Sequence, residues 1–65
     1  MNKNNAIKIS SVDAEYDYLD NLLGEWKLVE QSVLVEDDMV YDVLEIESKN
    51  KLHTFWFDIT SFYGI

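Results

Sequence analysis

The residues from 39 to 60 have the composition and spacing of a β-hairpin, and this feature constrains the fold most strongly. Both arms, 39–47 and 52–60, are rich in β-branched and aromatic residues and contain neither Gly nor Pro. Between the arms, Asn50 tolerates a positive φ, which suits a tight turn at Lys49 and Asn50. We therefore predict that Ser48 pairs with Lys51 and that this turn sets the register of both arms.

In this register one face of the hairpin carries mostly large apolar side chains. Leu44 lies opposite Phe55, and Asp42 lies opposite Phe57 on the same face. A shift by one residue would direct several charged side chains into the core. The pattern therefore predicts a core face on this hairpin, with Asp42 as its one awkward member.

The residues from 12 to 23 are predicted to form a helix that packs on the hairpin. Apolar residues recur at helical spacing along it: Val12, Tyr16, Leu19 and Leu23. Ser10 or Ser11 can cap the N-terminus, and Gly24 suits the position after the last turn.

The residues from 25 to 35 are predicted to form a further strand, joined to the hairpin by a turn at 36–38. A three-residue turn places Leu34 opposite Val40 and brings Trp26 and Leu28 onto the core face. A bulge near Gln31 would re-aim Glu30, and a two-residue turn would change the pairing.

These elements predict an α+β protein in which one N-terminal helix packs on a three-stranded antiparallel β-meander. The strands cover about 25–35, 39–47 and 52–60, in a single small domain from 10 to 65. Residues 1–9 are expected to be disordered or to add a short edge strand. The apolar tail, 61–65, is expected to fold over the seam between helix and sheet or to pack on a partner.

The net charge of −8 indicates a basic partner. All the acidic residues except Asp58 lie between Ile9 and Ser48, where Lys27 is the only base. Such a field attracts basic protein surfaces and repels nucleic acid and anionic membranes. We expect a protein partner with a basic surface, with no direct binding to nucleic acid or membrane. The alternative is that the charge only keeps the protein soluble.

Two groups of carboxylates stand out within this acidic segment. Asp13, Asp17 and Asp20 fall on one side of the predicted helix, about 5–6 Å apart. Glu36, Asp37 and Asp38 form the predicted turn. The row on the helix resembles a strand of phosphates in its spacing. One interpretation is therefore nucleic-acid mimicry, in which these six carboxylates stand in for phosphates. The alternative is a solvated helix face and a solvated turn.

The second face of the predicted sheet carries more apolar residues than an exposed face needs. Its members are Val29, Val33, Val35, Met39, Tyr41, Val43, Leu52 and Trp56. An apolar surface of this size is typical of an interaction site, and Trp56 and Tyr41 are residue types that anchor interfaces. We expect Val33, Met39 and Val43 to contribute, with a homodimer as the commonest arrangement. The alternative is that the ends of the chain cover this face.

The sequence offers little catalytic or metal-binding chemistry. His53 is the only histidine, there is no Cys, and the two glycines are isolated. We expect no catalytic residues, no metal site, no cofactor and no enzymatic activity.

The function predicted from these features is that of a small acidic binding protein that inhibits or sequesters a basic, nucleic-acid-binding protein. A phage or bacterial inhibitor of a defence or toxin protein fits this description. The N-terminus is polar and no apolar run reaches the roughly 20 residues of a membrane span, so we expect the cytoplasm of a bacterial host. The alternative function is an assembly module that forms homo-oligomers through the second apolar face.

Overall fold

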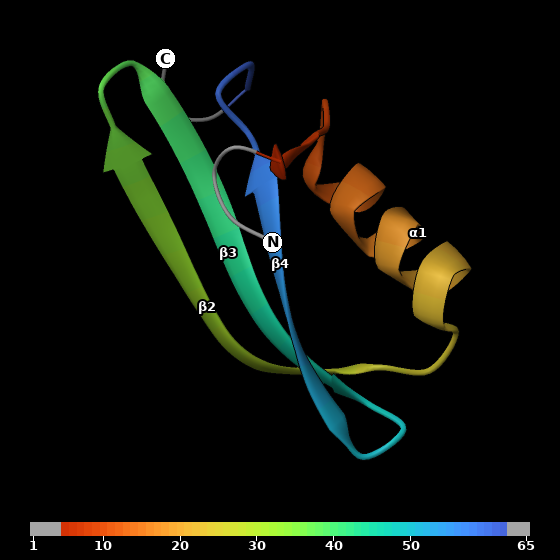
Figure 1. Ribbon diagram of the computed structural model, residues 1–65. Helices are drawn as coiled ribbons and strands as arrows, with labels where there is room; N and C mark the ends of the chain where they lie inside the picture. Colours follow the sequence, from red (N-terminus) through yellow and green to blue (C-terminus); the bar gives the residue numbers. More distant parts are fainter. Residues whose placement is uncertain (1–4, 63–65) are drawn as a thin grey trace.

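The computed structural model describes residues 5–62, which form one helix on one face of a four-stranded mixed sheet (Figure 1). Its elements are β1 (Ile7–Lys8), α1 (Val12–Leu23), β2 (Lys27–Glu36), β3 (Met39–Ser48) and β4 (Lys51–Asp58). The strand order is β1-β4-β3-β2. The predicted α+β class and antiparallel meander are confirmed. The sheet is mixed, however, because β1 pairs with β4 in parallel.

Helix α1 begins and ends where the capping residues predict. Ser11 is the N-cap, and its Oγ accepts a hydrogen bond of 3.1 Å from the Ala14 N–H. Gly24 takes a φ of 77° and donates its N–H to the Asp20 carbonyl at 3.0 Å. Each cap satisfies a backbone group that the helix leaves without an internal partner.

The β3–β4 hairpin has the predicted register. Ser48 pairs with Lys51, Leu44 with Phe55 and Asp42 with Phe57. Lys49 and Asn50 both take positive φ, 54° and 65°, as a two-residue hairpin turn requires.

The predicted register of the β2–β3 hairpin is wrong over residues 30–36, the part of β2 that leads into the turn. The turn contains two residues, Asp37 and Asp38, so Val35 lies opposite Val40, and Leu34 lies opposite Tyr41. A bulge between Leu28 and Glu30 then restores the predicted pairing of Leu28 with Ile46. The two-residue turn exchanges the faces of β2: Val33 and Val35 lie on the helix side, and Leu34 lies on the other.

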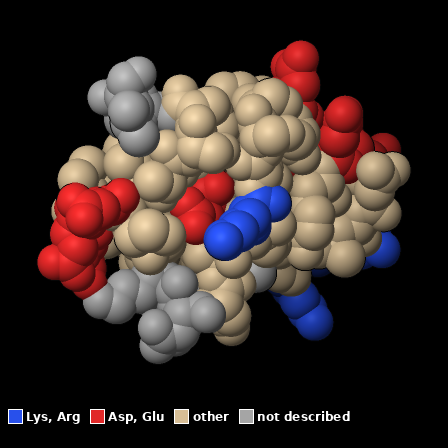
Figure 2. All heavy atoms as spheres, turned by 90° about the horizontal axis from the view of Figure 1, so that it is seen from above, with Lys and Arg blue, Asp and Glu red and all other residues tan. Residues whose placement is uncertain are grey.

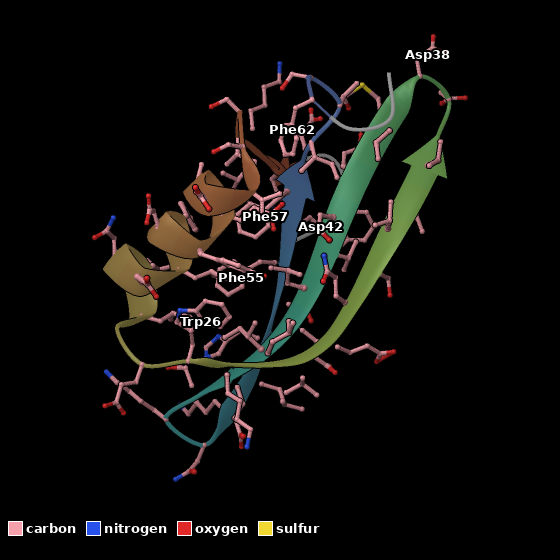
Figure 3. All side chains as sticks on the ribbon, turned by 180° about the vertical axis from the view of Figure 1, so that it is seen from behind. Trp26, Asp38, Asp42, Phe55, Phe57 and Phe62 are labelled. Carbon is pink, nitrogen blue, oxygen red and sulfur yellow. The ribbon has the colours of Figure 1, made fainter. Side chains whose placement is uncertain are left out.

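The core lies between α1 and the two strands β3 and β4. Its buried members are Leu19, Leu44, Ile46, Phe55, Phe57 and Ile59. Tyr18 of α1 meets Phe57 edge to face, with ring centroids 5.8 Å apart. Phe55 and Phe57 project from β4 toward α1 in Figure 3. Phe62, just after β4, also packs against this cluster, as predicted for the beginning of the tail.

The buried side of α1 differs from the predicted apolar stripe. Val12 is 53% exposed and Tyr16 is 40% exposed, whereas Glu15 and Leu19 are buried. The helix is thus rotated by about one residue position from the predicted orientation. Tyr18 takes part in the core instead of Tyr16, whose ring contacts Trp26 with centroids 5.6 Å apart.

Two predictions fall partly outside the described residues. Residues 1–9 are predicted to be disordered or to form an edge strand, and 1–4 of them lie outside the described residues. The last part of the apolar tail, 63–65, also lies outside them. Within residues 5–62, α1 is neither long enough nor apolar enough to cross a membrane.

Candidate protein-binding surfaces

One side of α1 forms an acidic surface with an aromatic side chain in it. Asp13, Asp17 and Asp20 are exposed there, beside the exposed side chains of Val12 and Tyr16. These five residues, called the α1 acidic surface below, are three or four positions apart and therefore neighbours on the helix. The predicted row of aspartates is exposed, and the rotation of α1 adds Tyr16 to it.

Trp26 ties the C-terminal part of this surface to the start of β2. Its indole Nε1–H donates a hydrogen bond of 2.7 Å to Asp20 Oδ1, and its ring contacts Tyr16. Asp20 thus already accepts a hydrogen bond within the chain. A carboxylate that mimics a phosphate would instead be available to the partner. Carboxylates beside an aromatic ring are suited to bind Lys or Arg, through ion pairs and through the face of the ring.

The acidic turn lies apart from the α1 acidic surface. Asp37 and Asp38 are exposed at the tip of the β2–β3 hairpin, and Asp37 takes a φ of 56°. Figure 2 shows two main groups of carboxylates at opposite sides of one face, with uncharged atoms, a smaller acidic patch and a basic side chain between them. The six predicted carboxylates of helix and turn therefore do not form one continuous row.

The outer face of the sheet, opposite α1, exposes less apolar surface than predicted. Tyr41 is buried and Trp56 is half-buried, and their rings meet at 5.7 Å. Met39 and Val43 are also half-buried. Val33 does not belong to this face, because the two-residue turn places it on the helix side. The predicted anchors thus spend much of their surface on each other.

Strand β2 is the most exposed apolar segment of the sheet. Nine of its ten residues are exposed, and α1 does not cover it (Figure 1). Val33 is 43% exposed and Val35 is 67% exposed on the helix side, while Leu34 is exposed on the outer face. Among residues 5–62, no segment pairs with the edge of β2 that faces away from β3.

A buried carboxyl pair joins α1 to β3. Glu15 is 2% exposed and Asp42 is 4% exposed, and their side chains are hydrogen-bonded to each other. Gln31 of β2 donates its Nε2–H₂ group to both Asp42 oxygens, at 2.9 and 3.1 Å. Figure 3 shows Asp42 near the middle of β3, the strand that lies between β4 and β2.

The environment of Glu15 favours its protonated form. Burial, the hydrogen bond to Asp42 and the charge of Asp42 raise the pKa of Glu15 to about 8. The carboxyl O–H of a neutral Glu15 can donate a hydrogen bond to Asp42, whose oxygens also accept hydrogen bonds from Gln31. The pair is thereby satisfied without a cation and serves as a structural link.

Sequence reasoning missed Glu15 and Gln31. A signal for them existed, since the confirmed hairpin register places Asp42 on the core face, where a carboxylate needs hydrogen-bond donors. Glu15 lies next to Tyr16 in the predicted stripe, so a small rotation of the helix is enough to bring it to Asp42.

His53 is half-buried and stacks on Phe55, with ring centroids 6.2 Å apart. In the part of the chain that the structure describes, no three His, Cys, Asp or Glu side chains are grouped so as to hold a metal ion.

We compared the chain with protein-family models, curated proteins and solved structures, and none of them matches.

Proposed function

We propose that this protein is a small, non-enzymatic binding protein that inhibits or sequesters a basic protein partner through its α1 acidic surface. The observation that carries the proposal is the exposure of Asp13 and Asp17 beside Tyr16, on the side of α1 that faces away from the sheet. A basic, nucleic-acid-binding protein has the complementary charge. A bacterial defence or toxin protein inhibited by a phage or bacterial product fits this proposal, in the cytoplasm of a bacterial host.

The physical basis is a combination of long-range attraction and a local anchor. A net charge of −8 speeds the encounter with a basic surface, and salt weakens this contribution. Tyr16 is an aromatic residue that remains exposed, and a lysine or arginine side chain can pack on its ring while binding Asp13 or Asp17.

Nucleic-acid mimicry is the narrower form of the proposal. Asp13 and Asp17 would take the place of phosphates in the partner's nucleic-acid site, and the acidic turn would lie outside the contact. Mimicry predicts that duplex or single-stranded nucleic acid competes with this protein for the partner. Binding without such competition leaves inhibition at another basic surface as the form that remains.

The proposal can be tested with two variants that change the net charge equally. Asp13→Asn with Asp17→Asn alters the α1 acidic surface, and Asp37→Asn with Asp38→Asn alters the acidic turn. Each immobilised protein is used to capture partners from a bacterial lysate at low and high salt. Captured proteins are then purified, and their affinities are measured by calorimetry.

We expect the helix variant to lose at least about tenfold in affinity, since it removes two charge-assisted contacts worth roughly 1 kcal/mol each. We expect the turn variant to bind nearly as tightly as the unmodified protein. Equal losses in both variants would show that only the overall charge matters. A partner whose affinity depends on neither pair, or not on salt, would contradict the proposal.

A second candidate function is an assembly module that forms homo-oligomers. The exposure of β2 favours this candidate more than the outer face does, because Tyr41 and Trp56 already pack on each other. The two candidates use different surfaces and can both hold.

A further inference from the structure

The two edges of the sheet differ in what they offer to another chain. One edge is β1, which contains only two residues. The other edge is β2, which contains ten. In an antiparallel edge strand, every second residue directs its N–H and C=O groups away from its neighbour, toward solvent or a new strand. The edge of β2 is therefore the place where the sheet can be extended.

The middle of β2 lacks the charged side chains and the Pro that usually protect an edge. The stretch from Gln31 to Val35 contains no charge and no Pro. Val33 and Val35 are exposed on one face, and Leu34 is exposed on the other. The bulge at Val29 interrupts the regular strand on one side, so the segment suited to pairing is 30–36, about 20 Å long.

The two ends of β2 differ in charge. Residues 36–38, at the turn to β3, are all acidic. The other end of the strand, beside the β3–β4 turn, carries three lysines and two glutamates: Lys27, Lys49, Lys51, Glu25 and Glu47. A strand of ten residues spans about 33 Å, several times the screening length in physiological salt. Each end therefore responds mainly to the charge that is placed next to it.

We infer that β2 pairs antiparallel with β2 of a second copy, so that two four-stranded sheets join into one. Antiparallel pairing places the acidic turn of each copy beside the lysine-containing end of the other. Parallel pairing would place the two acidic turns together. The unlike charges at the two ends of β2 therefore favour a second copy as the occupant and select the antiparallel direction.

The same arrangement limits the repulsion between two acidic molecules. Helix α1 packs over β4 and β3, on the far side of the sheet from the open edge (Figure 1). Asp13 and Asp17 of the two copies are thus kept apart. The dimer would present both α1 acidic surfaces at its outer sides, where a basic partner can reach them.

Symmetry restricts the register of the contact. A two-fold axis between antiparallel strands keeps each residue on its own face of the sheet. One residue must therefore lie directly opposite its own copy, with the axis passing between the two. An axis at Val33 would place Glu30 of each copy opposite Glu36 of the other, which is unfavourable for like charges. An axis at Ser32 pairs Glu30 with Leu34 instead, so we assign the register centred on Ser32. In both registers the contact adds Val33 and Val35 to one face and Leu34 to the other.

The first test is the mass in solution, measured by light scattering and sedimentation over a range of concentrations. We expect a dimer of the 7.7 kDa chain. Val33→Lys places like charges beside the axis and should weaken the dimer at least about tenfold. Leu52→Lys is the matched control, because Leu52 is an exposed residue of β4 away from the open edge. A chain that stays monomeric at millimolar concentration would overturn the inference.

The second test probes the charge at the ends of β2. Lys27→Glu should weaken the dimer roughly fivefold, since two end contacts of about 0.5 kcal/mol each are lost. Lys8→Glu changes the net charge equally but lies on β1, at the other edge, and should leave the dimer unchanged. Equal effects of the two variants would contradict the role given to the strand ends.

The third test uses cysteine cross-linking and does not depend on how well a lysine variant folds. The chain has no Cys, so a disulfide in a single-cysteine variant must join two copies. Ser32→Cys should cross-link readily, because the two copies of the residue at the axis have Cα atoms about 4.5–5.5 Å apart. Lys27→Cys should not, since its two copies would lie about 33 Å apart.

Cross-linking of Lys27→Cys as fast as Ser32→Cys would indicate parallel pairing and overturn the inference. Failure of Ser32→Cys to cross-link would also overturn it. None of these variants alters the α1 acidic surface. Binding of a basic partner is therefore tested separately, and either conclusion can fail while the other holds.

Discussion

Strands β2 and β3 are neighbours of equal length, yet their environments differ almost completely. Every residue of β3 is buried or half-buried, whereas nine of the ten residues of β2 are exposed. Both strands are rich in large apolar side chains. Composition alone therefore does not set burial in this sheet. The position of the strand does, because β3 has neighbours on both sides and α1 above it. Among residues 5–62, β2 has one neighbouring strand and no helix over it.

The comparison indicates that β3 and β4 stabilise the fold, whereas β2 presents an exposed apolar surface. The apolar residues of β3 and β4 supply the core, which a chain of 65 residues needs because it can bury only about 60% of its extended surface. The apolar residues of β2 contribute little to that core and remain available for contact with another molecule. Three predictions on stability test this contrast.

The largest effect is expected from a matched pair of leucines. Leu44 of β3 is 1% exposed, and Leu34 of β2 is 39% exposed. Leu44→Ala should cost about 2–5 kcal/mol, since it leaves a cavity in the core. This loss is comparable to the whole free energy of unfolding of so small a domain. Leu34→Ala should cost less than about 1 kcal/mol.

Urea denaturation followed by tryptophan fluorescence measures both losses. The measurements are made at low protein concentration, so that self-association does not contribute. Similar losses for the two variants would mean that β2 is covered in solution to the same extent as β3.

An intermediate effect is expected from the buried carboxyl of Glu15. Its pKa of about 8 in the folded protein lies above the usual value of 4.5, so the folded state retains a proton that the unfolded chain loses. The stability is therefore fully present below pH 4.5 and declines as the pH rises toward 8. The slope should be at most about 1.4 kcal/mol per pH unit.

Glu15→Gln should remove this decline, because the amide does not titrate in this range and can still donate a hydrogen bond to Asp42. Asp17→Asn is the matched control on the exposed side of α1, and it should leave the slope unchanged. The free energy of unfolding is measured at several values between pH 5 and 8. A slope that Glu15→Gln does not alter would show that Glu15 is ionised in the folded protein.

The smallest effect is expected between β2 and β3 on the outer face. Glu30 lies directly opposite Glu45, and two like charges in this position are unfavourable. Glu30→Lys should stabilise the protein by about 0.2–1 kcal/mol, with less gain at high salt. Ser32→Lys, two residues along the same face, provides the control, since it lies opposite Val43. Thermal unfolding at two salt concentrations is a sufficient measurement.

The helix and the β3–β4 hairpin could be predicted from local signals. Ser11 and Gly24 specify the ends of α1, and Asn50 with its neighbour Lys49 specifies a two-residue turn. Each signal acts within a few residues of the backbone that it controls, so it can be recognised without knowing the rest of the fold.

The register of β2 could not be predicted in the same way. Val33, Leu34 and Val35 are all apolar, so either parity of the strand appears suited to the core. The turn and the bulge at Val29 decided between them. The placement of Val33 on the outer face failed for this reason, and the number of apolar residues expected there fell.

The candidate site was predicted in part. The row of Asp13, Asp17 and Asp20 is exposed, as a helical wheel indicates. The exposure of Tyr16 and the contact of Asp20 with Trp26 could not be anticipated, because the apolar stripe assigned Tyr16 to the core.

The elements of this protein, their caps and turns, and the strong excess of acidic residues can all be recognised in the amino-acid sequence. The rotation of α1, the buried contact of Glu15 with Asp42, and the exposure of β2 depend on how the elements pack together. The physical reason is the range of the interactions involved. Caps and hairpin turns are satisfied by adjacent residues, whereas burial depends on which distant surfaces come together and on which strand is left at the edge.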